Sequence, residues 1–236
     1  MPENSAQERT IRITASQATL EGNLTIPANP RGVVLFAHGS GSSRHSPRNR
    51  YVAQELNRAG FATLLMDLLT AEEEAGELYT AHLRFDIAML AERLIDATDW
   101  LKKNRETAGL RIGYFGASTG GGAALVAAVG CPAQVSAIVS RGGRPDLAGP
   151  ALPRVKAPTL LIVGGDDREV IKLNQQAYDQ LDAGLDKKLE IVPGATHLFE
   201  EPGKLEEVAR LATGWFERYL PDREQLSGSE GLHVNR

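Results

Sequence analysis

Cysteine is nearly absent from this sequence of 236 residues, which contains only Cys131. A single cysteine cannot form a disulfide within the chain, and this fits the reducing environment of the cytoplasm. The polar first nine residues lack the apolar segment of a secretory signal peptide. No apolar run is long enough to cross a bilayer. The sequence therefore predicts a cytoplasmic protein with no signal peptide and no membrane association.

Basic runs are also lacking, and the formal net charge is −4. This charge pattern argues against a nucleic-acid surface and against long-range attraction to anionic membranes. His, Cys and Asp residues nowhere have the spacing of metal ligands, so we expect no metal ion and no cofactor. A small molecule is the expected partner, bound by a protein that is a monomer or a homodimer.

Apolar runs and amphipathic segments alternate along most of the chain. The first two runs predict an antiparallel hairpin, and the later continuous runs are typical of strands buried on both faces. The predicted strands are residues 10–15, 18–26, 32–38, 61–66, 110–115, 135–140, 159–163 and 188–192. The predicted helices are residues 47–59, 82–104, the segment from 119 onward, 169–183 and 204–220.

This alternation predicts a single α/β domain over residues 1–236, with its core between about residues 10 and 220. Its sheet should be mostly parallel, with about eight strands and with helices on both faces. The length suits one domain of this class. The polar tail, residues 222–236, is expected to be poorly ordered.

One serine lies between a predicted strand and a predicted helix, in the segment Gly116-Ala117-Ser118-Thr119-Gly120. The segment fits the pattern G-x-S-x-G, in which glycines allow a sharp turn and leave the serine hydroxyl at its apex. This strand–turn–helix context is that of the nucleophile elbow of α/β-hydrolases. Ser118 is therefore the predicted nucleophile.

A serine hydroxyl needs a base, and the base needs an orienting acid. In this fold the acid and then the histidine follow the serine along the chain. His197 follows the last predicted strand, whereas the other histidines precede Ser118 or lie in the tail. Asp166 and Asp167 follow the preceding strand. Asp167 is preferred because it stands three residues after Gly164, a spacing often seen at the acid turn, and Asp166 remains the alternative.

An oxyanion hole requires two backbone N–H donors. The N–H of Thr119 follows the nucleophile at a helix N-terminus, where the helix dipole also favours negative charge. The second donor is expected from the loop after the third strand, where Ser40 is preferred and Gly41 is the alternative.

Other residues in loops near the predicted site are candidates for substrate binding. The candidates are Gly41, Arg44, His45, Arg141 and Phe199. The cationic side chains of this region, which include Arg48 and Arg144, could recognise an anionic or polar group of a substrate. The other interpretation, which we favour, is a structural network with Asp67 or Asp146 as partners.

Several segments resemble those of α/β-hydrolases, and within that superfamily the sequence is similar to dienelactone hydrolase-like proteins from about Ile11 to Leu220. The segments that carry the resemblance are Phe36 to Arg44, Gly113 to Gly120, Ser140 to Asp146, Gly164 to Asp167 and Gly194 to Phe199. The founding members of that family carry cysteine as the nucleophile, whereas this chain has Ser118. The resemblance therefore implies hydrolase chemistry, and the serine moves the expectation toward general ester hydrolysis.

About twenty residues separate Ser140 from Leu160, enough for one short helical turn but not for a cap domain. An open site favours small or short-acyl esters. We therefore predict a serine carboxylesterase that acts through Ser118, His197 and Asp167. The alternatives are a lactone or dienelactone hydrolase and a non-catalytic binding protein of the same fold, and acyl transfer to an alcohol is also open.

Overall fold

An eight-stranded sheet forms the centre of the computed structural model, which describes residues 7–16, 18–80 and 82–221. The strand order is β1-β2-β4-β3-β5-β6-β7-β8, and the strands from β3 to β8 run parallel to one another while β1 and β2 run antiparallel to their neighbours. The strands are β1 (Gln7–Ala15), β2 (Ala18–Ile26), β3 (Val33–Ala37), β4 (Ala62–Met66), β5 (Ile112–Ala117), β6 (Val135–Arg141), β7 (Thr159–Gly164) and β8 (Lys187–Val192). The predicted fold class is confirmed. The tail that we expected to be poorly ordered lies outside the described residues.

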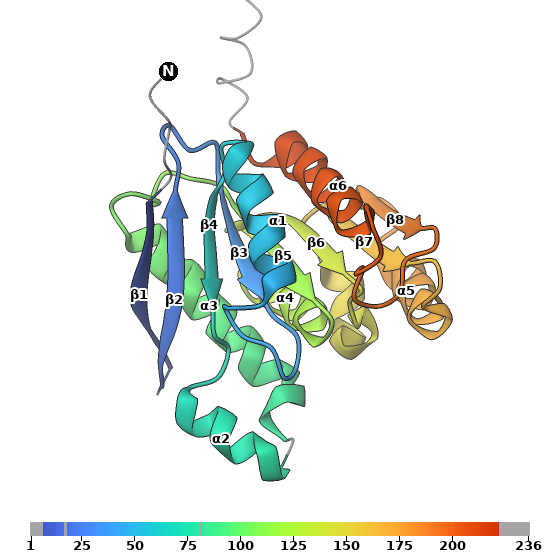
Figure 1. Ribbon diagram of the computed structural model, residues 1–236, viewed down its shortest axis with the longest axis horizontal. Coiled ribbons are helices and arrows are strands. Elements are labelled where there is room, and N and C mark those ends of the chain that lie inside the picture. The colour runs from blue at the N-terminus through green and yellow to red at the C-terminus, as the bar shows by residue number, and fades with distance from the viewer. Residues whose placement is uncertain (1–6, 17, 81, 222–236) are drawn as a thin grey trace, which may run out of the picture.

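Helices cover both faces of this sheet (Figure 1). α1 (Pro47–Arg58) and α6 (Lys204–Tyr219) pack on one face, while α3 (Ile87–Lys103), α4 (Thr119–Gly130) and α5 (Arg168–Gln180) pack on the other. Shorter segments are α2 (Ala71–Thr80) and the 3-10 segments η1 (Leu83–Phe85) and η2 (Pro145–Arg154). No helix in the described ranges combines the length and the apolar character needed to cross a membrane.

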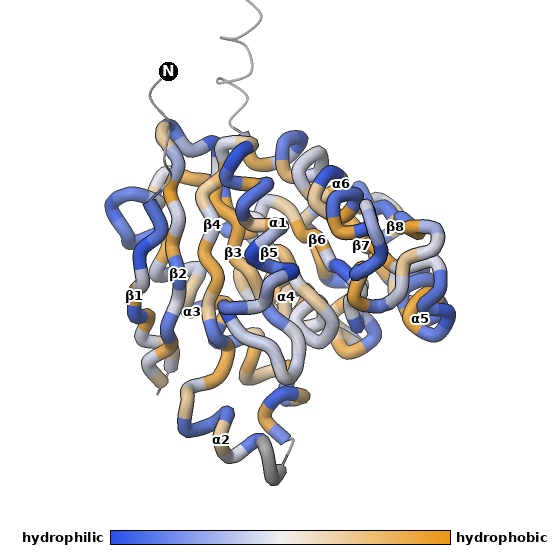
Figure 2. Tube along the Cα trace, viewed as in Figure 1, coloured by the Kyte–Doolittle hydropathy of each residue, from blue (hydrophilic) through white to orange (hydrophobic). Residues whose placement is uncertain are grey.

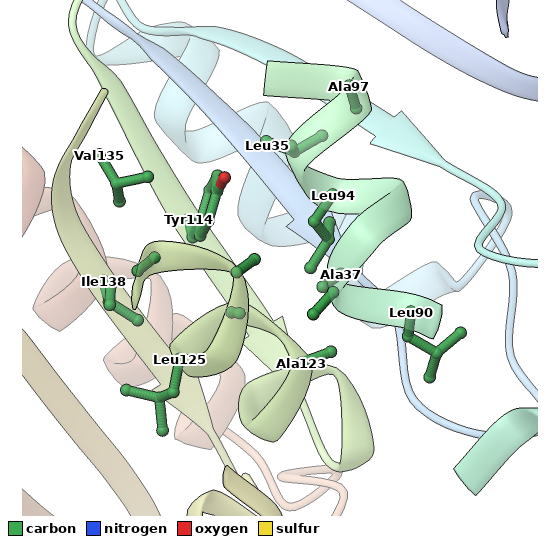
Figure 3. Close-up of a cluster of buried hydrophobic side chains, with 14 of the residues drawn as sticks. Leu35, Ala37, Leu90, Leu94, Ala97, Tyr114, Ala123, Leu125, Val135 and Ile138 are labelled. Atoms are coloured by element: carbon green, nitrogen blue, oxygen red, sulfur yellow. The ribbon is translucent and has the colours of Figure 1, made fainter. Parts of the chain in front are cut away.

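The apolar residues of the chain concentrate in the sheet and on the helix faces turned toward it, as the hydropathy colouring in Figure 2 shows. Every residue of β3 and β4 is buried, which explains why the sequence of these strands is almost continuously apolar. Figure 3 shows one layer of this core, in which Tyr114 of β5 lies among leucine and alanine side chains of α3 and α4. The buried Tyr114 hydroxyl is 2.5 Å from Thr98 Oγ1 and 3.4 Å from Cys131 Sγ, so this polar group has hydrogen-bond partners inside the core.

α4, the helix that follows β5, approaches the sheet very closely because its first turn contains glycines. A Cβ atom on Gly120 would lie 2.2 Å from the carbonyl oxygen of Ala37 at the end of β3. A Cβ atom on Gly116 would lie 2.6 Å from the carbonyl oxygen of Gly120. Such contacts are impossible for a larger residue without backbone movement, so these glycines allow α4 to start directly over β3 and β5.

Several local details differ from the sequence-based expectation, and one of them is α2, which is absent from the predicted helices. α3 begins at Ile87 rather than near residue 82, because the Asp86 carboxylate accepts a hydrogen bond from the N–H of Met89 at 3.0 Å and caps the helix. α5 ends at Gln180, since Leu181 is extended with ψ of 144°. The segment between β6 and β7 forms two short 3-10 helices joined by a kink at Gly149, whereas we predicted one turn. No cap domain is present within the described part of the chain.

Candidate active site

Ser118 lies at the turn between β5 and α4 with a backbone conformation that is rare for residues with side chains. Its φ and ψ are 50° and −123°. A conformation of this kind costs about 1–3 kcal/mol and persists only where the surrounding structure fixes it. Here the carbonyl oxygen of Ser118 accepts hydrogen bonds from the N–H groups of Gly121 at 3.0 Å and Arg144 at 2.9 Å. This strained strand-to-helix turn has the geometry expected of the nucleophile elbow that the sequence motif predicts.

His197 and Asp167 come together from the turns that follow β8 and β7. His197 Nδ1 lies 2.6 Å from Asp167 Oδ2. Asp167 occupies the N-cap position of α5, but its side chain makes no capping hydrogen bond, which leaves the carboxylate for the imidazole. The neighbouring Asp166 donates its backbone N–H to the carbonyl oxygen of Ala195 at 3.0 Å and so ties the two turns together. Of the two adjacent aspartates, Asp167 is thus the one that contacts the histidine.

A pocket of about 280 Å³ opens beside Ser118 and His197. It lies at the carboxyl ends of the parallel strands, where the topology of an open α/β sheet places a site. The lining residues are Gly39, Ser40, Ser42, Ser46, Arg48, Asn49, Ala117, Ser118, Arg141, His197 and Leu198. The pocket therefore contains the predicted nucleophile and base together with several polar side chains. Within the described ranges, no group of three or more His, Cys, Asp or Glu side chains is arranged to hold a metal ion.

The two predicted oxyanion donors lie next to each other. Ser118 occupies the N-cap position of α4 without a side-chain cap, so the N–H of Thr119 belongs to the first helical turn, which has no carbonyl partner within the helix. The N–H of Ser40 donates to the Thr119 hydroxyl oxygen at 2.9 Å. The structure thus gives the Ser40 amide a side-chain acceptor that the sequence did not indicate. Gly41 does not line the pocket but lies in a neighbouring crevice beside Arg84.

The structure separates the candidate substrate-binding residues into two groups. Arg141 lines the pocket, and the buried Phe199 supports it, with the Arg141 guanidinium 5.9 Å from the ring centroid. Arg44 and His45 are not among the lining residues. Arg44 instead forms ion pairs with Asp67 and Glu21, which is the structural network that we favoured. His45 is exposed on the loop before α1.

Sequence reasoning missed the contribution of the first turn of α1 to the pocket. Ser46 caps this helix by accepting a hydrogen bond from the N–H of Asn49 at 3.4 Å, and both residues line the pocket. A serine followed by proline is a recognisable start signal for a helix. The sequence did place the start of this helix at residue 47, where α1 begins, but only the fold shows that its first turn lines the pocket beside Ser118.

His38 is a structural residue of the loop that approaches Ser118. Its Nδ1–H donates to the carbonyl oxygen of Gly39 at 2.9 Å, and its Nε2 accepts the N–H of Leu68 at 2.9 Å. This pattern requires a neutral imidazole, since a protonated ring could not accept at Nε2. Burial lowers the pKa of His38 below its ordinary value of 6.5, and the hydrogen bond to Gly39 and nearby carboxylates oppose this effect only in part.

The buried imidazole predicts a pH-dependent contribution to stability. Because the folded protein favours neutral His38, this contribution is complete above pH 6.5 and is lost as the pH falls through the lowered folded-state pKa. Urea unfolding of the wild type and His38→Gln at pH 7.5, 6.5 and 5.5 checks this. The difference in unfolding free energy between the two proteins should shrink as the pH falls. Parallel pH profiles would contradict a neutral, hydrogen-bonded His38.

The fold and the site together define an α/β-hydrolase, and comparison with known proteins identifies the family. The family model of the dienelactone hydrolase family matches residues 20–220. The chain therefore belongs to the dienelactone hydrolase family, as its motifs predicted.

Two further comparisons concern solved structures. The chain is similar to a dienelactone hydrolase from Anabaena variabilis ATCC 29413, with 62% sequence identity, coverage of 91% of this chain and 99% of that chain, and a TM-score of 0.88. It also shares its fold with Est1E from Butyrivibrio proteoclasticus at 17% identity, covering 91% of this chain and 98% of that chain with a TM-score of 0.74.

Two curated relatives are longer than this chain and carry a different name. Two Mycobacterium tuberculosis proteins named "Putative phosphoribosyl transferase" are 58% identical to this chain over 214 residues, which is 91% of this chain and 47% of each relative. The chain thus spans about half the length of the curated relatives it matches. We attach their name to those whole proteins and not to this chain.

Proposed function

We propose that this protein hydrolyses carboxylic esters through a Ser–His–Asp triad. The observation that carries the proposal is the 2.6 Å contact between His197 Nδ1 and Asp167 Oδ2, beside a pocket that Ser118 also lines. Asp167 holds the proton on Nδ1 and leaves Nε2 free to act as a base. A serine, an imidazole and a carboxylate in these positions have the chemistry of nucleophilic acyl transfer.

In the first half of the proposed reaction, His197 Nε2 takes the proton of Ser118 Oγ as the oxygen attacks the ester carbonyl. The negative charge that develops on the carbonyl oxygen is stabilised by the N–H of Thr119 at the start of α4. The Ser40 N–H turns from the Thr119 hydroxyl to this oxygen, because a charged acceptor forms the stronger hydrogen bond. His197 then gives its proton to the departing alkoxide, which leaves as an alcohol.

In the second half, a water molecule enters the position left by the alcohol. His197 accepts one proton from this water while the oxygen attacks the acyl carbon of the Ser118 ester. The same two N–H groups stabilise the second tetrahedral intermediate. Its collapse returns the proton to Ser118 Oγ and releases the carboxylic acid, which restores the free protein.

The size of the pocket favours small substrates. A volume of about 280 Å³ is at the low end of what small-molecule sites provide, and no cap domain extends it within the described residues. Lactone hydrolysis is the second candidate, because the Anabaena variabilis relative with 62% identity is named a dienelactone hydrolase. A lactone passes through the same steps, except that the alcohol stays attached to the acyl group.

A substrate panel tests this proposal. We expect kcat/KM for 4-nitrophenyl acetate or butyrate to exceed that for the palmitate by about tenfold or more, since a pocket of about 280 Å³ cannot enclose the palmitoyl chain, which must bend out past the pocket rim. Dihydrocoumarin and γ-butyrolactone, assayed under the same conditions, measure the preference for lactones. Faster turnover of the palmitate would contradict the small, open site, and hydrolysis of lactones alone would favour the second candidate.

The third alternative, a binding protein without catalysis, makes a different prediction in the same assays. It would show no hydrolysis of any ester or lactone above the rate of His197→Ala. A transferase would release the alcohol faster when a second alcohol is added, with a new ester as product. Product analysis by mass spectrometry therefore separates all of these classes.

A further inference from the structure

β8 forms one edge of the sheet (Figure 1), and in the described part of the chain only β7 pairs with it. The N–H of Thr159 in β7 donates to the carbonyl oxygen of Asp186, just before β8, at 3.0 Å. Alternate residues of a strand direct their N–H and C=O groups to opposite sides, so the even-numbered residues of β8 face β7. The residues whose N–H and C=O groups face the open edge are therefore Lys187, Leu189 and Ile191. Edge groups of this kind are a template for a further strand.

Two apolar side chains of β8 are incompletely covered. Ile191 retains 38% of its accessible surface and is one of three large apolar side chains that are exposed among the described residues. Leu189, which precedes it by two positions and so lies on the same face of the sheet, is half-buried. A strand laid along this edge would cover part of both side chains, and removal of apolar surface from water favours such an association.

The charges of β8 are self-complementary about Leu189. Lys188 precedes it and Glu190 follows it, and the two side chains form an ion pair on the opposite face of the strand. In an antiparallel pair of two β8 strands centred on Leu189, Lys188 of each strand lies opposite Glu190 of the other. Opposite charges in such positions stabilise a strand pair, whereas like charges destabilise it. Lysine on an edge strand usually opposes pairing, but in this arrangement each lysine faces a glutamate.

We propose that two copies of this chain associate through antiparallel pairing of their β8 strands, with the twofold axis at Leu189. The two eight-stranded sheets then form one continuous sheet. Leu189 faces the open edge, so it can exchange both of its main-chain hydrogen bonds with Leu189 of the partner subunit, and Lys187 can do the same with Ile191 of the partner subunit. The intervening pairs, Lys188 with Glu190, are the closely spaced ones, in which side chains interact most strongly.

A second copy is the expected occupant because the features of this edge are symmetric about one residue. The outward-facing groups and the two opposite charges are all arranged evenly around Leu189, which an unrelated strand would not require. A pair of six-residue strands makes a small interface, so we expect a dimer with a dissociation constant in the micromolar range. The proposal does not depend on the proposed function.

Sedimentation equilibrium at protein concentrations from about 1 to 100 µM tests the proposal. We expect the average mass of the wild type to rise from the monomer value of 25.4 kDa toward twice that value. Glu190→Lys and Lys188→Glu should each raise the dissociation constant by about tenfold or more, because each sets two pairs of like charges opposite one another. The double exchange, Lys188→Glu with Glu190→Lys, restores opposite charges and should bring the dissociation constant back to within about threefold of the wild type.

Glu92→Lys is the matched control, since it makes the same charge change at an exposed position of α3, which packs beside β1 at the opposite edge of the sheet. It should leave the dissociation constant within about threefold of the wild type. A wild type that stays monomeric at the highest concentration would overturn the proposal. So would a dimer that neither single charge reversal weakens, because that dimer forms through another surface, and so would a double exchange that restores nothing.

Cysteine substitution tests the register of the pairing. Opposed residues of a hydrogen-bonded antiparallel pair have Cα atoms about 5.5 Å apart, which allows a disulfide, so Leu189→Cys should form a covalent dimer under mild oxidation. Ile191→Cys is the matched control, because its two copies would lie four residues, or about 14 Å, apart along the paired strands. The wild type, whose single Cys131 is buried, should form no covalent dimer. Equal yields from the two variants, or none from Leu189→Cys, would contradict pairing about Leu189.

Discussion

Replacement of Ser118 by alanine should lower kcat for ester hydrolysis by about ten-thousandfold or more, because removal of a triad nucleophile eliminates the covalent route. The variant should fold normally. Alanine keeps the Cβ atom that already occupies this strained turn. The hydrogen bonds that hold the turn involve only the main chain of residue 118, whose carbonyl oxygen accepts from Gly121 and Arg144 and whose N–H donates to the carbonyl oxygen of Arg141. Steady-state kinetics on 4-nitrophenyl butyrate, with a melting curve for each protein, checks both parts of the prediction.

Cys131→Ala provides the control for this experiment, since Cys131 is the only thiol of the chain. Cys131 lies at the far end of α4, and burial raises the pKa of its thiol. Its Sγ contacts the Tyr114 hydroxyl and donates to the carbonyl oxygen of Ala127 at 3.2 Å, so its replacement should affect stability and not kcat. Loss of activity in Cys131→Ala with activity retained in Ser118→Ala would contradict the assignment of the nucleophile.

Asp167→Asn should lower kcat by about a thousandfold to ten-thousandfold. The asparagine side chain can occupy the same space, but its N–H₂ group can donate to Nδ1 of His197 and stabilise the tautomer that has its proton on Nε2. His197 then cannot accept the proton of Ser118, and the charged imidazole of the transition state loses its counter-charge. KM should change little, because Asp167 does not line the pocket.

Asp166→Asn is the matched control, one residue away and of the same size. The backbone N–H of Asp166, and not its side chain, makes the contact with Ala195 that joins the two turns. We therefore expect kcat within about threefold of the wild type, as for a surface substitution without a buried partner. An equal loss of kcat in Asp167→Asn and Asp166→Asn would contradict the account. It would mean that the two aspartates maintain the conformation of the turn and that neither acts through a specific hydrogen bond to His197.

The strands and the order of the proposed catalytic residues could be predicted from the sequence, because the strands follow local apolar patterns and the order follows from the chain itself. Continuous apolar runs predict the buried parallel strands, and chain order in this fold limits the histidine to His197. The start of α3 was less accessible, since Leu83 and the residues from Ile87 onward share one apolar period while the Asp86 cap decides where the helix begins. The apolar period of a sequence shows which face of a helix is buried, but it does not show at which residue the hydrogen bonds of the helix begin.

Ion pairing in the site was predicted only in part. The partners expected from the sequence, Asp67 and Asp146, do pair with Arg44 and Arg144. Arg48, in contrast, finds its partner Glu200 at a separation of 152 positions, which no local pattern indicates. Nothing local distinguishes these arginines from Arg141, which reaches no carboxylate among the described residues. Which cation stays unpaired depends on how four loops meet at the edge of the sheet. The same holds for the choice between Asp166 and Asp167, which their side-chain directions decide.

Covalent labelling tests the central claim most directly, because it reports an activated serine whatever the natural substrate is. The wild-type protein is incubated with a fluorophosphonate probe, digested and mapped by mass spectrometry, beside Ser118→Ala and heat-unfolded protein. Our account predicts one adduct, on Ser118, in the folded wild type, and none in either control. Folded wild type that takes up no probe, or Ser118→Ala that is labelled to the same extent, would contradict it.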